Sequence, residues 1–190
     1  YRCMRIIAGD LRGKKLLIPN DNFTRPLKDA VKESIFNILQ HSKLLNCDLS
    51  NSSILDLFSG VGTFGLECIS RNSKHVTFFE NHLPAIKMLK KNIQNLNCFS
   101  KTKIIEKDVF SLEKLNTDIK NYEFIFLDPP FKEIRIKFLL NMLKNKKVFK
   151  KESIVLIHRD KNTLDHFPED FKVIIDKKYG RSRILFGKFC

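Results

Sequence analysis

Four acidic residues in the middle of the chain each stand at or just beyond the end of a short apolar run. They are Asp56 in SILDLF, Glu80 in HVTFFE, Asp108 in TKIIEKD and Asp128 in FIFLD. One such acid alone is most often a helix N-cap or a solvated turn residue. If the runs are parallel strands of one sheet, however, the four carboxylates lie at the same edge, where open α/β sheets bind their ligands.

A glycine-rich turn follows the first of these runs and precedes a helical pattern. Gly60, Gly62 and Gly65 form a G-x-G-x-x-G motif there. Glycine lets the backbone turn sharply and approach a ligand, and an acid about 20 residues later can accept the hydroxyls of a ribose. Glu80 is that acid, so the motif suits both NAD and S-adenosylmethionine.

The acids at 56 and 108 favour S-adenosylmethionine. Asp56 would repel a pyrophosphate but suits a ligand with an ammonium group, and Asp108 can accept the exocyclic amine of an adenine. An NAD oxidoreductase is the weaker alternative, because Asp56 and the later DPPF sequence have no role in it. The predicted site for S-adenosylmethionine, with S-adenosylhomocysteine as the product, comprises Asp56, Phe58, Gly60, Gly62, Glu80, Asn81, Asp108 and Val109.

The tetrapeptide from Asp128 to Phe131, DPPF, indicates the group that is methylated. The lone pair of a nucleobase amine is delocalised, but Asp128 and a backbone carbonyl near Pro129 can accept its two N–H bonds and orient the lone pair toward a sulfonium methyl. The prolines fix the backbone, and Phe131 can stack on an unpaired or flipped base. We therefore predict that Asp128, Pro129, Pro130 and Phe131 are catalytic and that no metal is required. His158, which ends a later apolar run, is expected to be a packed polar residue and not a general base.

Strand and helix patterns alternate around these motifs. We predict strands at 53–58, 75–80, 102–106, 122–128 and 153–158, helices at 63–71, 83–96 and 134–145, and a closing pair of strands within 171–189. Repeated β-α units imply an α/β fold with a mostly parallel sheet covered by helices on both faces. Before them, a basic hairpin is expected within 4–19, and a helix with Pro26 in its first turn. We divide the chain into an RNA-contacting extension, 1–45, and a methyltransferase domain, 46–190.

Composition limits the class of protein. The 190 residues are 43% hydrophobic and 29% charged, which is typical of a soluble globular domain. No apolar run approaches the ~18 residues of a membrane span, no signal peptide is indicated, and five scattered cysteines form no C-x-x-C pair. We therefore expect a cytoplasmic protein with free thiols and without a membrane partner.

The net charge of +14 is concentrated at the two ends of the chain. Residues 1–40 carry 8 basic and 4 acidic side chains, a net of +4, and residues 144–190 carry 13 and 6, a net of +7. Lysines that only maintain solubility are one explanation. A pI near 9.6 with charge at both ends favours a polyanion such as nucleic acid.

The motifs RIIAG, RGKKL, TRP, KESIFN, LDLFSGVGTFGLE and FLDPPF together resemble the RsmD family, bacterial methyltransferases of 16S ribosomal RNA, over essentially the whole chain. The resemblance implies a seven-stranded class I methyltransferase fold and methyl transfer to N2 of one guanine in 16S rRNA within the small ribosomal subunit. It matches Arg25 and Pro26 to an element that flanks the active site. We further predict that Arg5, Arg12 and Lys14 contact RNA and that the protein is a monomer.

Two positions depart from the family pattern. Leu27 stands where a small hydroxyl residue is common, and Arg181 stands where an acid is common after YG. Both positions concern substrate contacts more than the cofactor site. Two other functions stay open, an adenine-N6 methyltransferase of nucleic acid and an RNA-binding factor of ribosome assembly.

Overall fold

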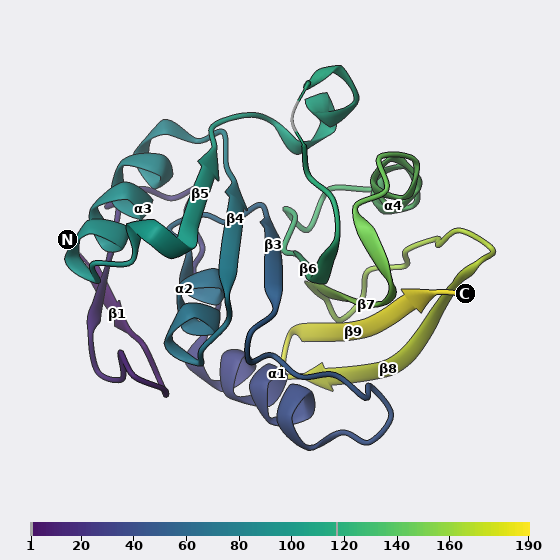
Figure 1. Cartoon of the computed structure of the whole chain (residues 1–190), viewed down its shortest axis with the longest axis horizontal. Helices are drawn as coiled ribbons and strands as arrows, with labels where there is room; N and C mark the ends of the chain where they lie inside the picture. The colour runs from purple at the N-terminus through teal and green to yellow at the C-terminus, as the bar shows by residue number, and fades with distance from the viewer. Residues whose placement is uncertain (1, 117) are drawn as a thin grey trace.

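A sheet of seven strands forms the centre of the fold in this computed structural model, which describes residues 2–116 and 118–190 (Figure 1). In order across the sheet, the strands are β5 (Thr102–Ile105), β4 (His75–Phe79), β3 (Ser53–Leu57), β6 (Tyr122–Leu127), β7 (Phe149–Asp160), β9 (Ser182–Phe189) and β8 (Phe171–Tyr179). The five from β5 to β7 are parallel, whereas β9 is antiparallel to both of its neighbours. The predicted mostly parallel sheet, closed by an antiparallel pair, is confirmed.

Helices cover both faces of this sheet, as the alternation of β-α units predicted. One face carries α1 (Asp29–His41), α2 (Thr63–Ser70) and α3 (Leu83–Asn95), and the other carries α4 (Ile136–Asn145) and the 3₁₀ helix η2 (Val109–Lys114). A shorter 3₁₀ helix, η1 (Phe99–Lys101), precedes β5. Neighbouring strand residues therefore enter different cores, because successive side chains point to opposite faces of a sheet.

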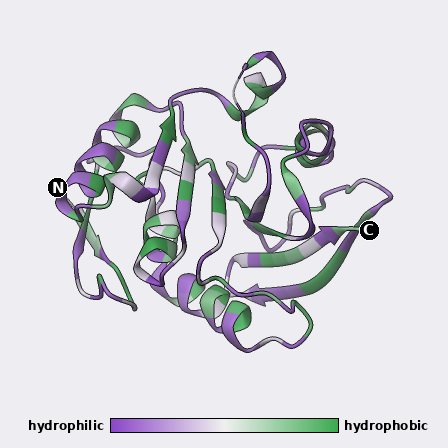
Figure 2. Ribbon diagram, in the orientation of Figure 1, coloured by the Kyte–Doolittle hydropathy of each residue, from purple (hydrophilic) through white to green (hydrophobic). Residues whose placement is uncertain are grey.

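Hydropathy follows this layering. The central strands show green stretches interrupted by white and purple ones in Figure 2, and the helices show alternating green and purple bands, as expected for helices with one face on a core. Within the part of the chain that is described, no helix is long and apolar enough to cross a membrane.

Two elements begin three or more residues away from their predicted first residue. The strand expected at 153–158 extends over Phe149–Asp160, and its first residue pairs with Tyr122 across an irregularity in the ladder. The helix expected to include Pro26 in its first turn begins only at Asp29. Lys28, with φ −63° and ψ 145°, is extended, so the segment around Pro26 approaches the helix as extended chain.

An antiparallel hairpin, β1 (Arg2–Arg5) and β2 (Lys15–Ile18), precedes the sheet and lies beside α3 (Figure 1). Its loop is attached to α2: both carboxylate oxygens of the buried Glu67 accept backbone N–H groups, from Ile7 at 2.9 Å and Ala8 at 3.0 Å. Buried Lys32 of α1 lies 3.9 Å from the same carboxylate. The hairpin and α1 thus share buried polar contacts and one hydrophobic core with the rest of the chain, and the boundary at residue 45 stays a prediction.

Candidate active site

A cavity of about 180 Å³ lies at the carboxyl ends of β3, β4, β5 and β6. It is lined by Phe58, Phe79, Glu80, Asn81, Lys107, Asp108, Val109, Phe110, Pro130, Glu133 and Arg135. Six of these were predicted from the sequence, and they come from three different cofactor segments and from the DPPF loop. The volume is below the roughly 300–1,000 Å³ of typical ligand pockets. The cavity can therefore enclose only part of a ligand, and the rest must extend over the neighbouring surface.

The glycine turn lies next to this cavity. The structure requires glycine at its three glycine positions for different reasons. Gly60 has φ +56°, its backbone N–H donates to Glu80 Oε2 at 2.6 Å, and a Cβ there would meet no atom within 4 Å. A Cβ on Gly62 would lie 2.5 Å from the side chain of Leu89, and one on Gly65 would lie 2.4 Å from the ring of Phe78. Gly62 and Gly65 therefore permit close packing, and only Gly60 leaves open space for a ligand.

This difference predicts that alanine at Gly60 affects ligand binding, whereas alanine at Gly65 affects stability. Gly60→Ala is expected to weaken S-adenosylhomocysteine binding by about tenfold or more, because its Cβ enters the open space beside the cavity. Gly65→Ala is expected to lower the free energy of unfolding by about 1–3 kcal/mol through overpacking. Calorimetry and chemical denaturation measure the two effects.

Gly180→Ala is the matched control for Gly60→Ala. Gly180 also has φ +56° and open space at its Cβ position, but it lies in the β8–β9 turn. Its substitution carries the same backbone strain and should leave S-adenosylhomocysteine affinity unchanged. Equal loss of affinity in both variants would contradict a ligand contact at Gly60.

Asp56 is fully buried beneath the glycine turn. Its Oδ2 accepts the Gly65 N–H at 3.1 Å, whereas its Oδ1 has no hydrogen-bond partner among the described residues. Burial raises the pKa of Asp56 well above its ordinary value, and the nearby charges of Asp128 and Glu80 raise it further. An unpaired buried carboxylate oxygen in negative surroundings is suited to a cation or a water molecule that carries its contact to one.

The other two predicted cofactor acids, Glu80 and Asp108, make local hydrogen bonds and also line the cavity. Glu80 Oε1 accepts the N–H groups of Asn81 and His82, both at 2.9 Å. Asp108 caps η2 by accepting the Phe110 N–H at 2.9 Å, so the N-cap role considered for an isolated acid is present here as well. Each carboxylate also borders the cavity, where it can accept hydrogen bonds from a ligand.

Aromatic rings and one arginine form the remaining wall of the cavity. Phe58 has φ +60°, an unusual backbone conformation for an aromatic residue and one that is typical of functional sites. Its ring lies 6.1 Å from that of Phe110, and the guanidinium carbon of Arg135 lies 3.6 Å from the Phe110 ring centre. Arg135 also pairs with Glu133 at 2.7 Å. These contacts give the cavity flat apolar surfaces that suit a purine ring.

Together these groups fit S-adenosylmethionine. Gly60 leaves open space, Asp56 Oδ1 and the buried Ser59 Oγ lack partners among the described residues, and Glu80 and Asp108 supply acceptors. Asp56 would hold the ammonium end, Glu80 the ribose and Asp108 the adenine. Within the same described residues, no group of three or more His, Cys, Asp or Glu side chains is arranged to hold a metal ion.

The DPPF loop is held in place by two neighbouring residues of β7. His158 Nδ1 lies 2.8 Å from Asp128 Oδ1, and the His158 ring meets the edge of Phe131 at 6.0 Å between centres. The buried guanidinium of Arg159 donates to the carbonyl oxygens of Pro130 at 3.1 Å and Glu133 at 2.5 Å. Its Nε donates to Asp165 at 2.9 Å. The loop therefore has a fixed backbone, and the Pro130 carbonyl is already occupied.

Several residues of this site were not predicted from the sequence. They are His158, Arg159, Glu133, Arg135 and Phe110. Phe110, Glu133 and Arg135 lie within a few residues of Asp108 or DPPF, so a wider window around those motifs would have included them. Arg159 carries no local signal, because a charged residue near a strand end is ordinary.

The predicted substrate residues lie in two different places. Arg25 is exposed and Pro26 half-buried, in a segment whose Asp21 Oδ2 lies 3.0 Å from His82 Nε2, directly after the acid and amide at 80–81. Arg5, Arg12 and Lys14 are exposed on the hairpin, which is attached at the far end of α2 and contributes no residue to the cavity. The Asp21–His82 contact thus joins the segment before Arg25 to the chain that follows Glu80, whereas none of the five predicted substrate residues lines the cavity, and their roles stay predictions.

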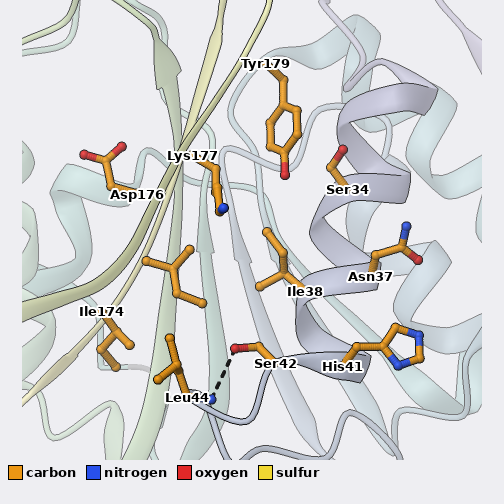
Figure 3. Close-up of a pocket in the computed structure, with 11 residues that line it drawn as sticks. Ser34, Asn37, Ile38, His41, Ser42, Leu44, Ile174, Asp176, Lys177 and Tyr179 are labelled. Carbon is orange, nitrogen blue, oxygen red and sulfur yellow. Dashed lines mark hydrogen bonds between the residues drawn. The ribbon is translucent and has the colours of Figure 1, made fainter.

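A larger hollow, of about 860 Å³, lies between α1 and β8 (Figure 3). In Figure 3, Ser34, Asn37 and His41 of α1 line one side and Tyr179 the other, whereas Asp176 points away and pairs with Arg183. None of the predicted catalytic or cofactor residues borders this hollow, and none of its lining residues is a carboxylate that faces into it. The smaller cavity, with its acids and glycine turn, is the better candidate.

Known proteins resemble the whole of this chain. The family model described as conserved hypothetical protein 95 matches residues 4–188. Ribosomal RNA small subunit methyltransferase D of Buchnera aphidicola subsp. Acyrthosiphon pisum is 36% identical over 156 residues, or 82% of this chain and 78% of that protein. The protein of the same name from Haemophilus influenzae is 32% identical over 178 residues, or 93% of this chain and 89% of that protein.

A solved structure agrees with the fold. The Escherichia coli protein yhhF, provisionally named a methyltransferase, has a TM-score of 0.82 and is 23% identical, covering 99% of this chain and 98% of that one. The predicted α/β methyltransferase fold is therefore confirmed. With the family model and the two curated relatives, this shows that the chain belongs to the family described as conserved hypothetical protein 95, the RsmD family that its motifs resemble.

Proposed function

We propose that this protein transfers a methyl group from S-adenosylmethionine to the exocyclic N2 amine of a guanine in 16S rRNA of the small ribosomal subunit. One observation carries the proposal: Pro130 of the DPPF loop lines the same cavity as Glu80 and Asp108. The loop that receives the amine and the acids that hold the cofactor thus border one space. The rRNA substrate is supported by the names of the relatives and by the net charge of +14.

The reaction requires little chemistry from the protein. S-adenosylmethionine supplies an activated, electrophilic methyl group when it is bound. Asp128 and the carbonyl of Pro129 accept the two N–H bonds of the amine and orient its lone pair, so that catalysis comes from positioning and electrostatics. The Pro129 carbonyl suits this role, since no donor among the described residues reaches it, whereas the Pro130 carbonyl is bound by Arg159 and by the Glu133 N–H.

The base itself is held by the aromatic residue of the loop. Phe131 is 37% exposed, so its ring is accessible to a flat partner. Stacking of this kind requires that the guanine is unpaired or flipped out of its helix. After transfer, the methylated amine loses one proton, to Asp128 or to water, and becomes neutral.

The proposal also covers the RNA contacts, the form of the substrate, the oligomeric state and the location of the protein. Arg25 and Pro26 contact the RNA beside the site, and Arg5, Arg12 and Lys14 contact it farther away on the 1–45 extension. The substrate is the small subunit and not free RNA, and the enzyme acts as a monomer in the cytoplasm. The basic residues at both ends of the chain support this picture, because each one that reaches a phosphate releases a counterion.

The proposal is tested by mapping the methylated nucleotide. The protein is incubated with small subunits that lack the modification and with S-adenosylmethionine labelled in its methyl group, and the rRNA is digested and analysed by mass spectrometry. We expect label in N2-methylguanosine at one position. Free 16S rRNA and duplex DNA serve as parallel substrates.

Each of the other possible results of this experiment would support a different function or substrate. Label in N6-methyladenine would favour the adenine methyltransferase, because an Asp-Pro-Pro-Phe loop can accept either amine. Tight subunit binding without methyl transfer would favour an assembly factor. Efficient labelling of free RNA would overturn the subunit as the substrate.

A further inference from the structure

His158 links the catalytic loop to the last strand of the sheet. Its Nδ1 lies 2.8 Å from Asp128 Oδ1, and its Nε2 lies 2.9 Å from the hydroxyl of Ser182 on β9. The residue is only 8% exposed, and the Phe131 ring packs edge-on against the imidazole at an angle of 72°. Both ring nitrogens thus have partners, and the plane of the ring is fixed.

These contacts determine where the proton of the neutral ring lies. A carboxylate can only accept hydrogen bonds, so Nδ1 must carry the hydrogen that points at Asp128. Nε2 then has a lone pair and accepts the hydroxyl hydrogen of Ser182. In this tautomer, no basic nitrogen faces the amine that is methylated, and His158 is not suited to act as the base.

The same arrangement divides the two oxygens of Asp128 between two roles. Oδ1 is held by His158, whereas no described residue donates to Oδ2. We propose that His158 is a positioning residue, which orients the Asp128 carboxylate so that Oδ2 accepts an N–H bond of the substrate amine. Ser182 selects the tautomer that His158 needs. This inference rests on the proposed function of Asp128 in methyl transfer.

A purely structural His158 would behave differently. If the ring only fills space at the end of β7, any side chain of similar size should preserve activity. If its Nδ1–H orients the carboxylate, activity should depend on a hydrogen-bond donor at that one point. Asparagine offers such a donor because its side-chain nitrogen occupies nearly the place of Nδ1, and leucine has a similar volume without one.

The test compares His158→Leu and His158→Asn with the wild-type protein on small subunits. We expect His158→Leu to lower kcat by about tenfold to a hundredfold, the range that a hydrogen bond to a charged group supplies. KM for S-adenosylmethionine and the affinity for S-adenosylhomocysteine should stay within about twofold, since His158 does not line the cavity. His158→Asn should recover most of the lost kcat. Unchanged kcat in His158→Leu, or equal loss in both variants, would overturn the inference.

A second measurement does not depend on activity. Nitrogen-15 NMR of the free wild-type protein distinguishes the two tautomers of histidine, and we expect His158 in the Nδ1–H form. The Nε2–H form would overturn the inference. Absence of methyl transfer by the wild-type protein would instead count against the proposed function, and the NMR result would still decide the role of His158.

Discussion

Replacing Asp128 with alanine is expected to lower kcat for methyl transfer by about a hundredfold or more, the scale seen when one preorganised hydrogen-bonding group is removed from an active site. In the proposed mechanism this carboxylate accepts an N–H bond of the amine and orients its lone pair, and the DPPF sequence contains no second acid to replace it. S-adenosylhomocysteine affinity should change little, because Asp128 does not line the cavity of Glu80 and Asp108. Methyl transfer to small subunits, calorimetry with S-adenosylhomocysteine and a subunit-binding assay measure the three quantities.

Two further variants test whether the effect comes from the negative charge of Asp128 itself. Asp128→Asn keeps an oxygen that can accept from His158 but removes the negative charge. Its kcat for methyl transfer should therefore be low, and its free energy of unfolding should equal that of the wild type. Asp160→Ala removes another acid at the end of β7, whose Oδ1 accepts only the local Asn162 N–H, and should leave activity within about twofold. An Asp128→Ala protein with near-normal activity would refute the assigned role.

Replacing Arg159 with leucine is expected to lower the free energy of unfolding by about 3–5 kcal/mol, the cost of breaking a buried ion pair by removing one partner. Arg159 is fully buried and pairs with Asp165, whose side chain is 2% exposed. The substitution also removes the guanidinium that donates to the Pro130 and Glu133 carbonyls, so the DPPF loop should lose its fixed position. The shift of the midpoint in urea measures the first effect, and methyl transfer measures the second.

A double variant distinguishes loss of stability from loss of loop position. Arg159→Leu combined with Asp165→Leu removes the uncompensated buried charge and should recover most of the stability. Its rate of methyl transfer should stay low, because the loop carbonyls still lack the guanidinium of Arg159. Arg183→Leu is the matched control, since this more exposed arginine of β9 pairs with Asp176 and donates to Thr163 without touching the loop. It should cost about 1 kcal/mol or less.

The sequence predicts most of the sheet, and also that Glu80, Asp108 and their neighbours lie together, because those signals are local. Each strand is a short apolar run, and each acid stands at a fixed place relative to the end of its own run. Strand order then places the acids together without further information, since the ends of neighbouring parallel strands meet at one edge. The glycine motif was also recognised correctly as a turn between strand and helix, although only Gly60 leaves space for a ligand.

The second half of the site depends on contacts between distant segments. His158 meets Asp128 across 30 residues, and Arg159 meets Pro130 across 29, through the register in which β6 pairs with β7. The pattern of apolar and polar residues along one strand does not show in which register that strand pairs with its neighbour. Pro26 was misplaced for a related reason: proline is common in the first helical turn, but it fits an extended segment equally well, and here the buried Leu27 holds that segment on the core.

The hydrogen bonds that fasten the N-terminal hairpin have a consequence for folding during synthesis. Leu17 exchanges backbone bonds with the side chain of Asn92, and the loop before it depends on Glu67 of α2. A chain emerging from the ribosome therefore exposes its hairpin before the acceptors that hold it have been made. The hairpin is therefore translated before α2 and α3 but can reach its final position only after them, and until residue 92 has emerged its cationic side chains lack these contacts.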